Sequence, residues 1–271
     1  QCLVGSEMCI RDRIDDAMNF DSNRSFLKRI QIAREKKLQK SLYKGIDFFV
    51  LLSKAMEEKI PEAVGQNIVI EGIYGRHELP VVENTCRNEN LKIILYGGTL
   101  QEFSGVNDFV DAFMLLKGEN YRLVICGSGF CESHIKESAK KDDRIDYRGI
   151  VSREELLLLQ RKATLLINPR KPTEEITRFS FPSKTIEYLV SGTPMLGYKL
   201  EGIPVEYYDY FYTVDDLSLQ GMANKLEEVL SLPDEERHLM AERAKTFIYQ
   251  NKTAEYQICL LYTSDAADDL T

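Results

Sequence analysis

Short apolar runs that alternate with segments of helical periodicity constrain the fold of this 271-residue chain more than any other feature. A short apolar run bounded by turn residues is typical of a buried strand. Strands that alternate with helices form parallel sheets, and the crossovers between such strands are right-handed. The sequence therefore predicts an α/β fold, with strands at residues 91–96, 121–126, 145–148, 164–168, 193–197 and 211–214.

The helical segments between and after these runs follow from the spacing of their apolar residues. Ser152 and Glu155 form a capping-box pattern, which marks the start of one helix. Pro182 suits the first turn of another, where its missing N–H costs nothing. Helices are expected at residues 106–116, 131–141, 152–162, 182–191, 217–231 and 234–250.

The region before the first of these strands looks like part of a different domain. Residues 48–52 and 67–71 read as strands around a short helix that begins at Lys54. The polar segment 76–90 has no periodicity, so we expect it to be a linker. The predicted division is residues 14–90 as a domain remnant with its linker and 91–232 as a complete domain, followed by residues 233–258 as a C-terminal helix.

The two ends of the chain resemble translated adaptor sequence. Met8–Asp12 fits the codons ATG-TGT-ATA-AGA-GAC, the mosaic end of a transposon-based sequencing adaptor. Cys259–Ser264 fits the reverse complement of the same element. We therefore expect residues 1–13 and 259–271 to be foreign to the protein, as a tag is.

Composition excludes several classes of protein. Outside the two ends, the cysteines are Cys86, Cys126 and Cys131, which lack the spacing of a disulfide framework or a zinc site. A formal charge of −8 argues against general nucleic-acid binding. No apolar run approaches the roughly 18 residues that a membrane span requires.

Three segments follow strand ends, where open parallel sheets bind their ligands. They are Gly97-Gly98-Thr99, Gly127-Ser128-Gly129 and Asn168-Pro169-Arg170. Glycine lets the backbone approach a phosphate closely, although a simple turn explains these glycines equally well. Residues 127–132 read GxGxxE and lack the third glycine of the dinucleotide fingerprint, which disfavours an NAD-binding protein.

The segment 178–194 carries the most chemistry. On a helix, Ser183, Lys184 and Glu187 lie on neighbouring parts of one face. Ser183, Lys184 and the first amides can hold a diphosphate, while Glu187 can accept hydrogen bonds from two adjacent sugar hydroxyls. Arg170 can add a bidentate phosphate contact. The alternative is a solvated helix with a surface Lys184–Glu187 pair, and the pattern alone leaves both interpretations open.

Taken together, these motifs resemble a family 4 (group 1) retaining glycosyltransferase. The motifs occur in the family's order and spacing: Gly97-Gly98, Gly127-Ser128-Gly129, Arg148-Gly149-Ile150-Val151, Asn168-Pro169-Arg170 and FPSKTIEYLVSGTP at 181–194. The resemblance implies that residues 91–232 form the C-terminal Rossmann-like domain of a GT-B fold, with helices on both faces of its sheet. It also implies that residues 45–75 belong to an incomplete second Rossmann-like domain, and that the helix at 234–250 crosses back towards it.

What the resemblance implies for function is hexosyltransferase-like sugar transfer. The donor is a nucleoside diphosphate-sugar, the acceptor is a carbohydrate or a lipid-linked acceptor, and the reaction retains configuration without metal or other cofactor. Donor availability implies a cytoplasmic site, peripheral to the membrane. By match to the family's motifs, Glu187 binds the donor ribose, and Lys184 and Arg170 balance leaving-group charge. The remaining matched donor-binding positions are Gly98 near the diphosphate, Ile150 and Val151 beside the nucleobase, and Thr99, Gly127, Gly129, Phe181 and Ser183.

The chain departs from the family pattern at three places. Thr99 and Ser104 stand where many members have arginine and lysine, and Phe179 stands where many have a glutamate. Glu174 or Glu175 is a candidate substitute for that glutamate. The alternatives are a nucleotide-sugar epimerase of the same fold and a degenerate, non-catalytic nucleotide-sugar binder. We expect the chain as given to bind nucleotide without turnover.

Overall fold

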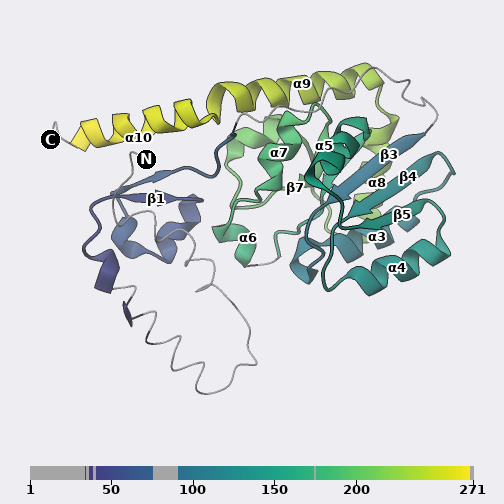
Figure 1. Cartoon of the computed structure of the whole chain (residues 1–271), viewed down its shortest axis with the longest axis horizontal. Helices are drawn as coiled ribbons and strands as arrows, with labels where there is room; N and C mark the ends of the chain where they lie inside the picture. Colours follow the sequence, from purple (N-terminus) through teal and green to yellow (C-terminus); the bar gives the residue numbers. More distant parts are fainter. Residues whose placement is uncertain (1–33, 35–36, 39–40, 76–90, 174, 269–271) are drawn as a thin grey trace.

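The computed structural model describes residues 34, 37–38, 41–75, 91–173 and 175–268. Its main body is a six-stranded parallel sheet in the order β5-β4-β3-β6-β7-β8 (Figure 1). This confirms the predicted α/β parallel-sheet fold. The strands are β3 Lys92–Gly97, β4 Tyr121–Cys126, β5 Ile145–Gly149, β6 Leu165–Asn168, β7 Met195–Tyr198 and β8 Tyr212–Val214.

The order of the strands creates one point at which the chain reverses its direction of travel across the sheet. From β3 the chain moves outward through β4 to β5, then returns to place β6 on the other side of β3. In open sheets of this kind, ligands bind in the crevice beyond the carboxyl ends of the strands at the reversal. A ligand site is therefore expected at the loops that follow β3 and β6.

Helices cover both faces of the sheet, as predicted. On one face α3 packs against α4 and α8, and on the other α5 packs against β3 while α7 packs against β6 and α9. The helices are α3 Val106–Met114, α4 Glu132–Lys141, α5 Arg153–Lys162, α6 Ile176–Phe179, α7 Lys184–Val190, α8 Leu219–Ser231, α9 Asp234–Asn251 and α10 Ala254–Asp268.

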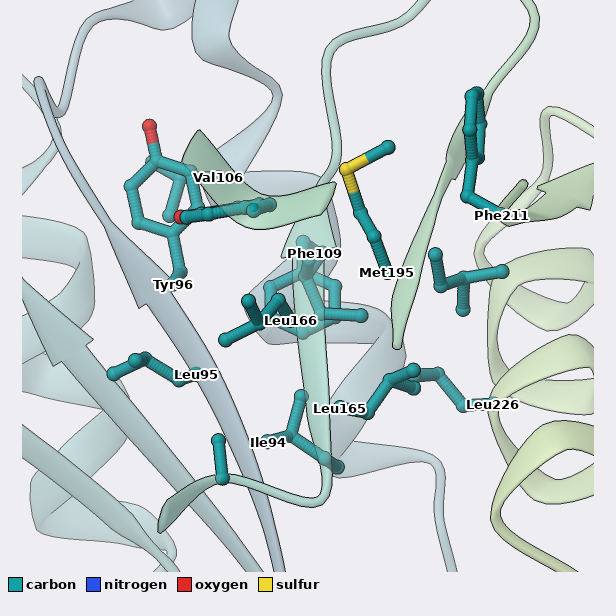
Figure 2. Close-up of a cluster of buried hydrophobic side chains, with 14 of the residues drawn as sticks. Ile94, Leu95, Tyr96, Val106, Phe109, Leu165, Leu166, Met195, Phe211 and Leu226 are labelled. Atoms are coloured by element: carbon teal, nitrogen blue, oxygen red, sulfur yellow. The ribbon is translucent and has the colours of Figure 1, made fainter. Parts of the chain in front are cut away.

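The core lies between the sheet and these helices. Side chains of the central strands are fully buried, and Figure 2 shows them stacked against residues of α3 and α8. The labelled members of this cluster are Ile94, Leu95, Tyr96, Val106, Phe109, Leu165, Leu166, Met195, Phe211 and Leu226. Cys126 is also buried, as expected of a small core residue.

Local signals in the sequence placed most element boundaries within a few residues. The N–H of Glu155 donates to Ser152 Oγ at 3.1 Å, so the predicted cap of α5 is confirmed. The helix α7 begins at Lys184 instead of Pro182. The reason is local: the Pro182 carbonyl accepts the Thr185 N–H at 2.8 Å, so a turn precedes the regular helix.

A smaller N-terminal unit has its own hydrophobic cluster. Its parallel strands β1 Phe49–Leu51 and β2 Asn67–Val69 are joined through the 3-10 helices η2 Lys54–Glu58 and η3 Pro61–Ala63. The cluster also contains Phe179, which comes from α6. The expected linker at 76–90 and the expected foreign segment at 1–13 lie outside the described residues.

The last two helices run along one side of the molecule and connect the two units (Figure 1). At the turn between them, Thr253 pairs with Tyr74 in an isolated parallel bridge. Lys252 Nζ lies 2.5 Å from Glu71 Oε1, and the Tyr207 hydroxyl donates to the same carboxylate at 2.6 Å. The helix α10 continues across residue 259, the expected start of foreign sequence. Within the described part of the chain, no helix combines the length and apolarity needed to cross a membrane.

Candidate functional site

The loops that follow β3 and β6 adjoin at the chain reversal, the edge of the sheet where open parallel sheets form their ligand crevice. Gly98 follows β3 with a φ of 154°, and a Cβ added to it would lie 1.5 Å from Lys184 Nζ. The Lys184 side chain therefore lies directly across the loop, and the positive φ of Gly98 favours glycine at this position. Gly105 similarly admits the Pro169 carbonyl, which a Cβ would approach to 2.2 Å. Close backbone packing therefore joins the ends of β3 and β6.

Lys184 is held against Tyr96, the residue next to last in β3. The ammonium donates to the Tyr96 hydroxyl at 3.1 Å and lies 4.2 Å from the centroid of its ring. The same hydroxyl donates to the Thr99 carbonyl at 2.7 Å, which fixes its orientation. Burial, and after it the charge of Arg170, lowers the pKa of Lys184 to about 8, although Glu187 opposes the shift. Burial raises the pKa of Tyr96 to about 12, so its hydroxyl stays neutral.

Arg170 approaches the same crevice from the end of β6. Its guanidinium stacks on the Phe103 ring at 5.2 Å, and Nη1 lies 3.5 Å from Ser180 Oγ. Burial lowers the pKa of this guanidinium too. Neither Lys184 nor Arg170 forms an ion pair within the described residues, yet both are largely buried. Buried cations need an anionic partner, so this edge of the sheet is suited to bind an anion such as a phosphate.

Glu187 lies in the first turn of α7 and is partly buried. Its Oε1 accepts a hydrogen bond from Gln160 Nε2 at 2.6 Å. Because Lys184 is bonded to Tyr96 and Glu187 to Gln160, the alternative surface Lys184–Glu187 pair does not form among the described residues. Among those residues, moreover, no three His, Cys, Asp or Glu side chains are grouped so that they could hold a metal ion.

The glycines after β4 serve the packing of the loops. A Cβ on Gly127 would lie 1.7 Å from the Gly98 carbonyl oxygen. The N–H of Gly127 donates to the Gly149 carbonyl at 2.7 Å, and the N–H of Gly129 donates to Glu132 Oε1 at 3.1 Å. These two amides are therefore engaged within the protein, and the glycines act by allowing the β3 and β4 loops to lie in contact.

The other predicted site residues fall into two groups. Thr99 and Ser183 are exposed near the crevice, and Ile150 is 79% exposed just after β5, with Val151 packed on the core behind it. Phe181 is not brought to the crevice. Its ring is buried and tilted against Tyr207 at a centroid distance of 5.3 Å.

Phe179 explains the departure from the family pattern at its position. The side chain is 2% exposed and belongs to the hydrophobic cluster of the N-terminal unit. Glu175, proposed as a substitute acid, is instead paired with Lys59 of that unit at 3.0 Å. Glu174 lies outside the described residues.

Sequence reasoning missed Tyr96, Phe103 and Gln160. Tyr96 ends an apolar run, a pattern that predicts only a strand. Gln160 follows four leucines in α5, and its polarity in that stretch was a usable signal.

The comparison with protein families matches residues 82–247 to the model described as glycosyl transferases group 1. A search of curated protein sequences finds no match.

Solved structures with similar folds are numerous. Sucrose-phosphate synthase from Thermosynechococcus elongatus has a TM-score of 0.67 at 17% identity, covering 93% of this chain and 64% of its own. A mutant of TarM from S. aureus, in complex with fondaparinux, alpha-GlcNAc-glycerol and UDP, has a TM-score of 0.65 at 15% identity, covering 88% and 46%. HepE from Anabaena, in complex with UDP and glucose, has a TM-score of 0.64 at 14% identity, covering 85% and 66%.

At these identities the likeness establishes the fold, the GT-B parallel-sheet architecture. The chain spans between about half and two thirds of the length of these proteins.

Proposed function

The chain belongs to the group 1 glycosyl transferases, and from this premise we propose that it serves the transfer of a sugar from a nucleoside diphosphate-sugar to a carbohydrate or lipid-linked acceptor, with retention of configuration and without metal. The chain as given is proposed to bind the donor nucleotide without turnover. In this reaction the bond between the anomeric carbon and the diphosphate oxygen breaks. The acceptor hydroxyl oxygen forms the new bond to the anomeric carbon, the departing diphosphate oxygen keeps the electron pair of the broken bond, and the acceptor proton passes to the departing nucleoside diphosphate.

The observation that carries the proposal is the pair of largely buried cations at the chain reversal. Negative charge grows on the diphosphate as it leaves, and preorganised positive charge in a site of low dielectric stabilises that change strongly. Lys184 is fixed by Tyr96 and Arg170 is fixed by Phe103, so neither has to reorganise when the charge develops.

Other contacts of the donor are assigned to the same edge. Glu187 accepts hydrogen bonds from the ribose hydroxyls, and Gly98 lets the diphosphate approach the backbone. The exposed side chain of Ile150, with Val151 behind it, offers an apolar surface to the nucleobase. Thr99 and Ser183 supply exposed hydroxyl groups at the rim, and Gly127 and Gly129 shape the loop.

UDP is the first nucleotide to examine, because the TarM and HepE structures contain it. The acceptor class is proposed on the family alone. A cytoplasmic location at the membrane surface is likewise proposed from where such donors are made.

The test is calorimetric titration of the full chain with UDP, GDP and ADP in EDTA, beside the variant Glu187→Ala. The proposal predicts saturable binding of one nucleotide without metal, weakened by the substitution. If a demonstrably folded chain binds none of the three, the assignment of this crevice as the donor site is wrong.

A further inference from the structure

Gln160 is a buried polar residue that the proposed function leaves unexplained. Its side chain is 0% exposed, near the C-terminal end of α5. Its Nε2 donates to Glu187 Oε1, and its backbone carbonyl accepts the Thr193 hydroxyl at 2.7 Å. Its Oε1 is buried and has no partner among the described residues.

A half-satisfied buried amide is unfavourable for folding. An acceptor without a partner loses its hydration and gains nothing in return, whereas an apolar side chain of similar shape avoids that loss. The same helix places Leu156 and Leu159 against the core, so the position readily suits an apolar residue. The amide orientation is also determined, because turning it would set Oε1 against the carboxylate of Glu187. Residues that lower stability in this way are concentrated at functional sites.

The hydrogen bond from Gln160 to Glu187 joins two neighbouring helices. Helices α5 and α7 both run back from the carboxyl ends of parallel strands, and Glu187 lies in the first turn of α7. Gln160 lies near the last turn of α5 and donates its hydrogen bond to this carboxylate. The contact therefore joins the C-terminal end of one helix to the N-terminal end of the other. A carboxylate has about four lone-pair sites. Gln160 occupies one of them, and Glu187 Oε2 has no partner in the described part of the chain.

We infer that Gln160 is a positioning residue, which fixes the plane of the Glu187 carboxylate so that its remaining lone pairs accept two adjacent hydroxyls of a ribose. The inference rests on the proposed function, because it assumes that Glu187 faces the ribose of a nucleoside diphosphate. The inference adds that recognition of the ribose depends on Gln160, a buried residue of α5 that does not contact the ligand.

The experiment compares UDP with 2′-deoxy-UDP by calorimetry on the full chain, and repeats the comparison with the GDP and ADP pairs. The variant is Gln160→Met, which keeps an unbranched side chain without a hydrogen-bonding amide. Glu187→Gln is the reference for loss of the acid. Tyr208→Phe is the matched control, because its hydroxyl is bonded to the backbone of Leu200 away from the crevice.

The wild-type chain should prefer the ribonucleotide by about tenfold or more, as expected of a hydrogen bond to a charged group. In Gln160→Met that preference should fall by about threefold or more. Its melting temperature should stay equal to that of the wild type or rise by roughly 2–4 °C. A residue with a merely structural role would lower the melting temperature and leave the preference unchanged. Tyr208→Phe should keep the wild-type preference.

Retention of the full preference in Gln160→Met overturns the inference and leaves the proposed function standing, provided that Glu187→Gln loses it. If the wild type and Glu187→Gln bind UDP equally and neither prefers the ribonucleotide, the ribose role of Glu187 is wrong and the inference falls with it.

Discussion

If the proposed donor site binds a nucleoside diphosphate, the lowered pKa of Lys184 should make that binding depend on pH in a predictable direction. Burial lowers this pKa to about 8, so the unliganded protein carries a mixture of charged and neutral Lys184 in the mildly alkaline range. With that pKa, the charged fraction is about 90% at pH 7 and about 10% at pH 9. If only the ammonium form binds the diphosphate, the apparent affinity should fall by roughly tenfold between these two values.

Two substitutions at the same position separate this effect from other titrations. Lys184→Arg keeps its charge throughout the range, so its affinity should stay level with pH. Lys184→Met should bind about 10–150-fold more weakly at pH 7, the equivalent of roughly 1.5–3 kcal/mol for hydrogen bonds to a charged group. Its residual binding should also be level with pH.

Stability of the unliganded chain should change in the opposite direction. The folded-state pKa of Lys184 lies below its ordinary value, so the unfolded chain binds more protons between the two. The contribution of this group to stability therefore rises as pH increases from about 8 to the ordinary lysine value near 10.4. Lys184→Met should lack that rise and should melt at a higher temperature than the wild type at pH 7.

The measurements are calorimetric titration at pH 7, 8 and 9 in buffers of different ionisation enthalpy, and thermal melts without ligand. Proton uptake on binding at pH 8 and above is expected in the wild type and absent from Lys184→Met. A wild-type affinity that does not change with pH, or a pH dependence that persists in Lys184→Met, would refute the reasoning.

Three further substitutions test the supporting contacts. Tyr96→Phe removes the hydroxyl that accepts from Lys184, so the midpoint of the pH profile should move to lower pH in the same titrations. Lys252→Met leaves the buried carboxylate of Glu71 without its cation and should cost about 3–5 kcal/mol in urea unfolding; a loss below 1 kcal/mol would show that the pair is dispensable. Phe179→Ala should cost about 3–5 kcal/mol locally, seen as faster hydrogen exchange in β1 and β2 while the six-stranded sheet keeps its protection.

More of the fold than of the candidate site could be predicted from the sequence. Strand β4 matched its prediction residue for residue, because Tyr121–Cys126 is an apolar run closed by glycine. The convergence of Gly98, Arg170 and Lys184 also followed from sequence, since all three stand at strand or helix ends that parallel topology brings to one edge. Each of these signals is local to its own segment, so it can be interpreted without knowledge of tertiary contacts.

The contacts that were missed are tertiary. Nothing near Tyr96 in the sequence indicates that its hydroxyl bonds a lysine 88 residues away. Phe181 illustrates the converse, because its place in a site motif gave no hint that Tyr207 would cover its ring. The local sequence around Phe179 does not predict its burial, because the cluster that buries it belongs to another part of the chain.

The burial of Phe179 also has a mechanical consequence. The segment 170–184 begins with one cation of the crevice and ends with the other, and between them Phe179 is embedded in the N-terminal unit. A displacement of that unit would move Phe179 and, through the backbone on either side of it, change the distance between Arg170 and Lys184. Linkage is reciprocal. A ligand that shifts the N-terminal unit would alter anion affinity at the crevice by the same factor by which a bound anion alters the affinity for that ligand.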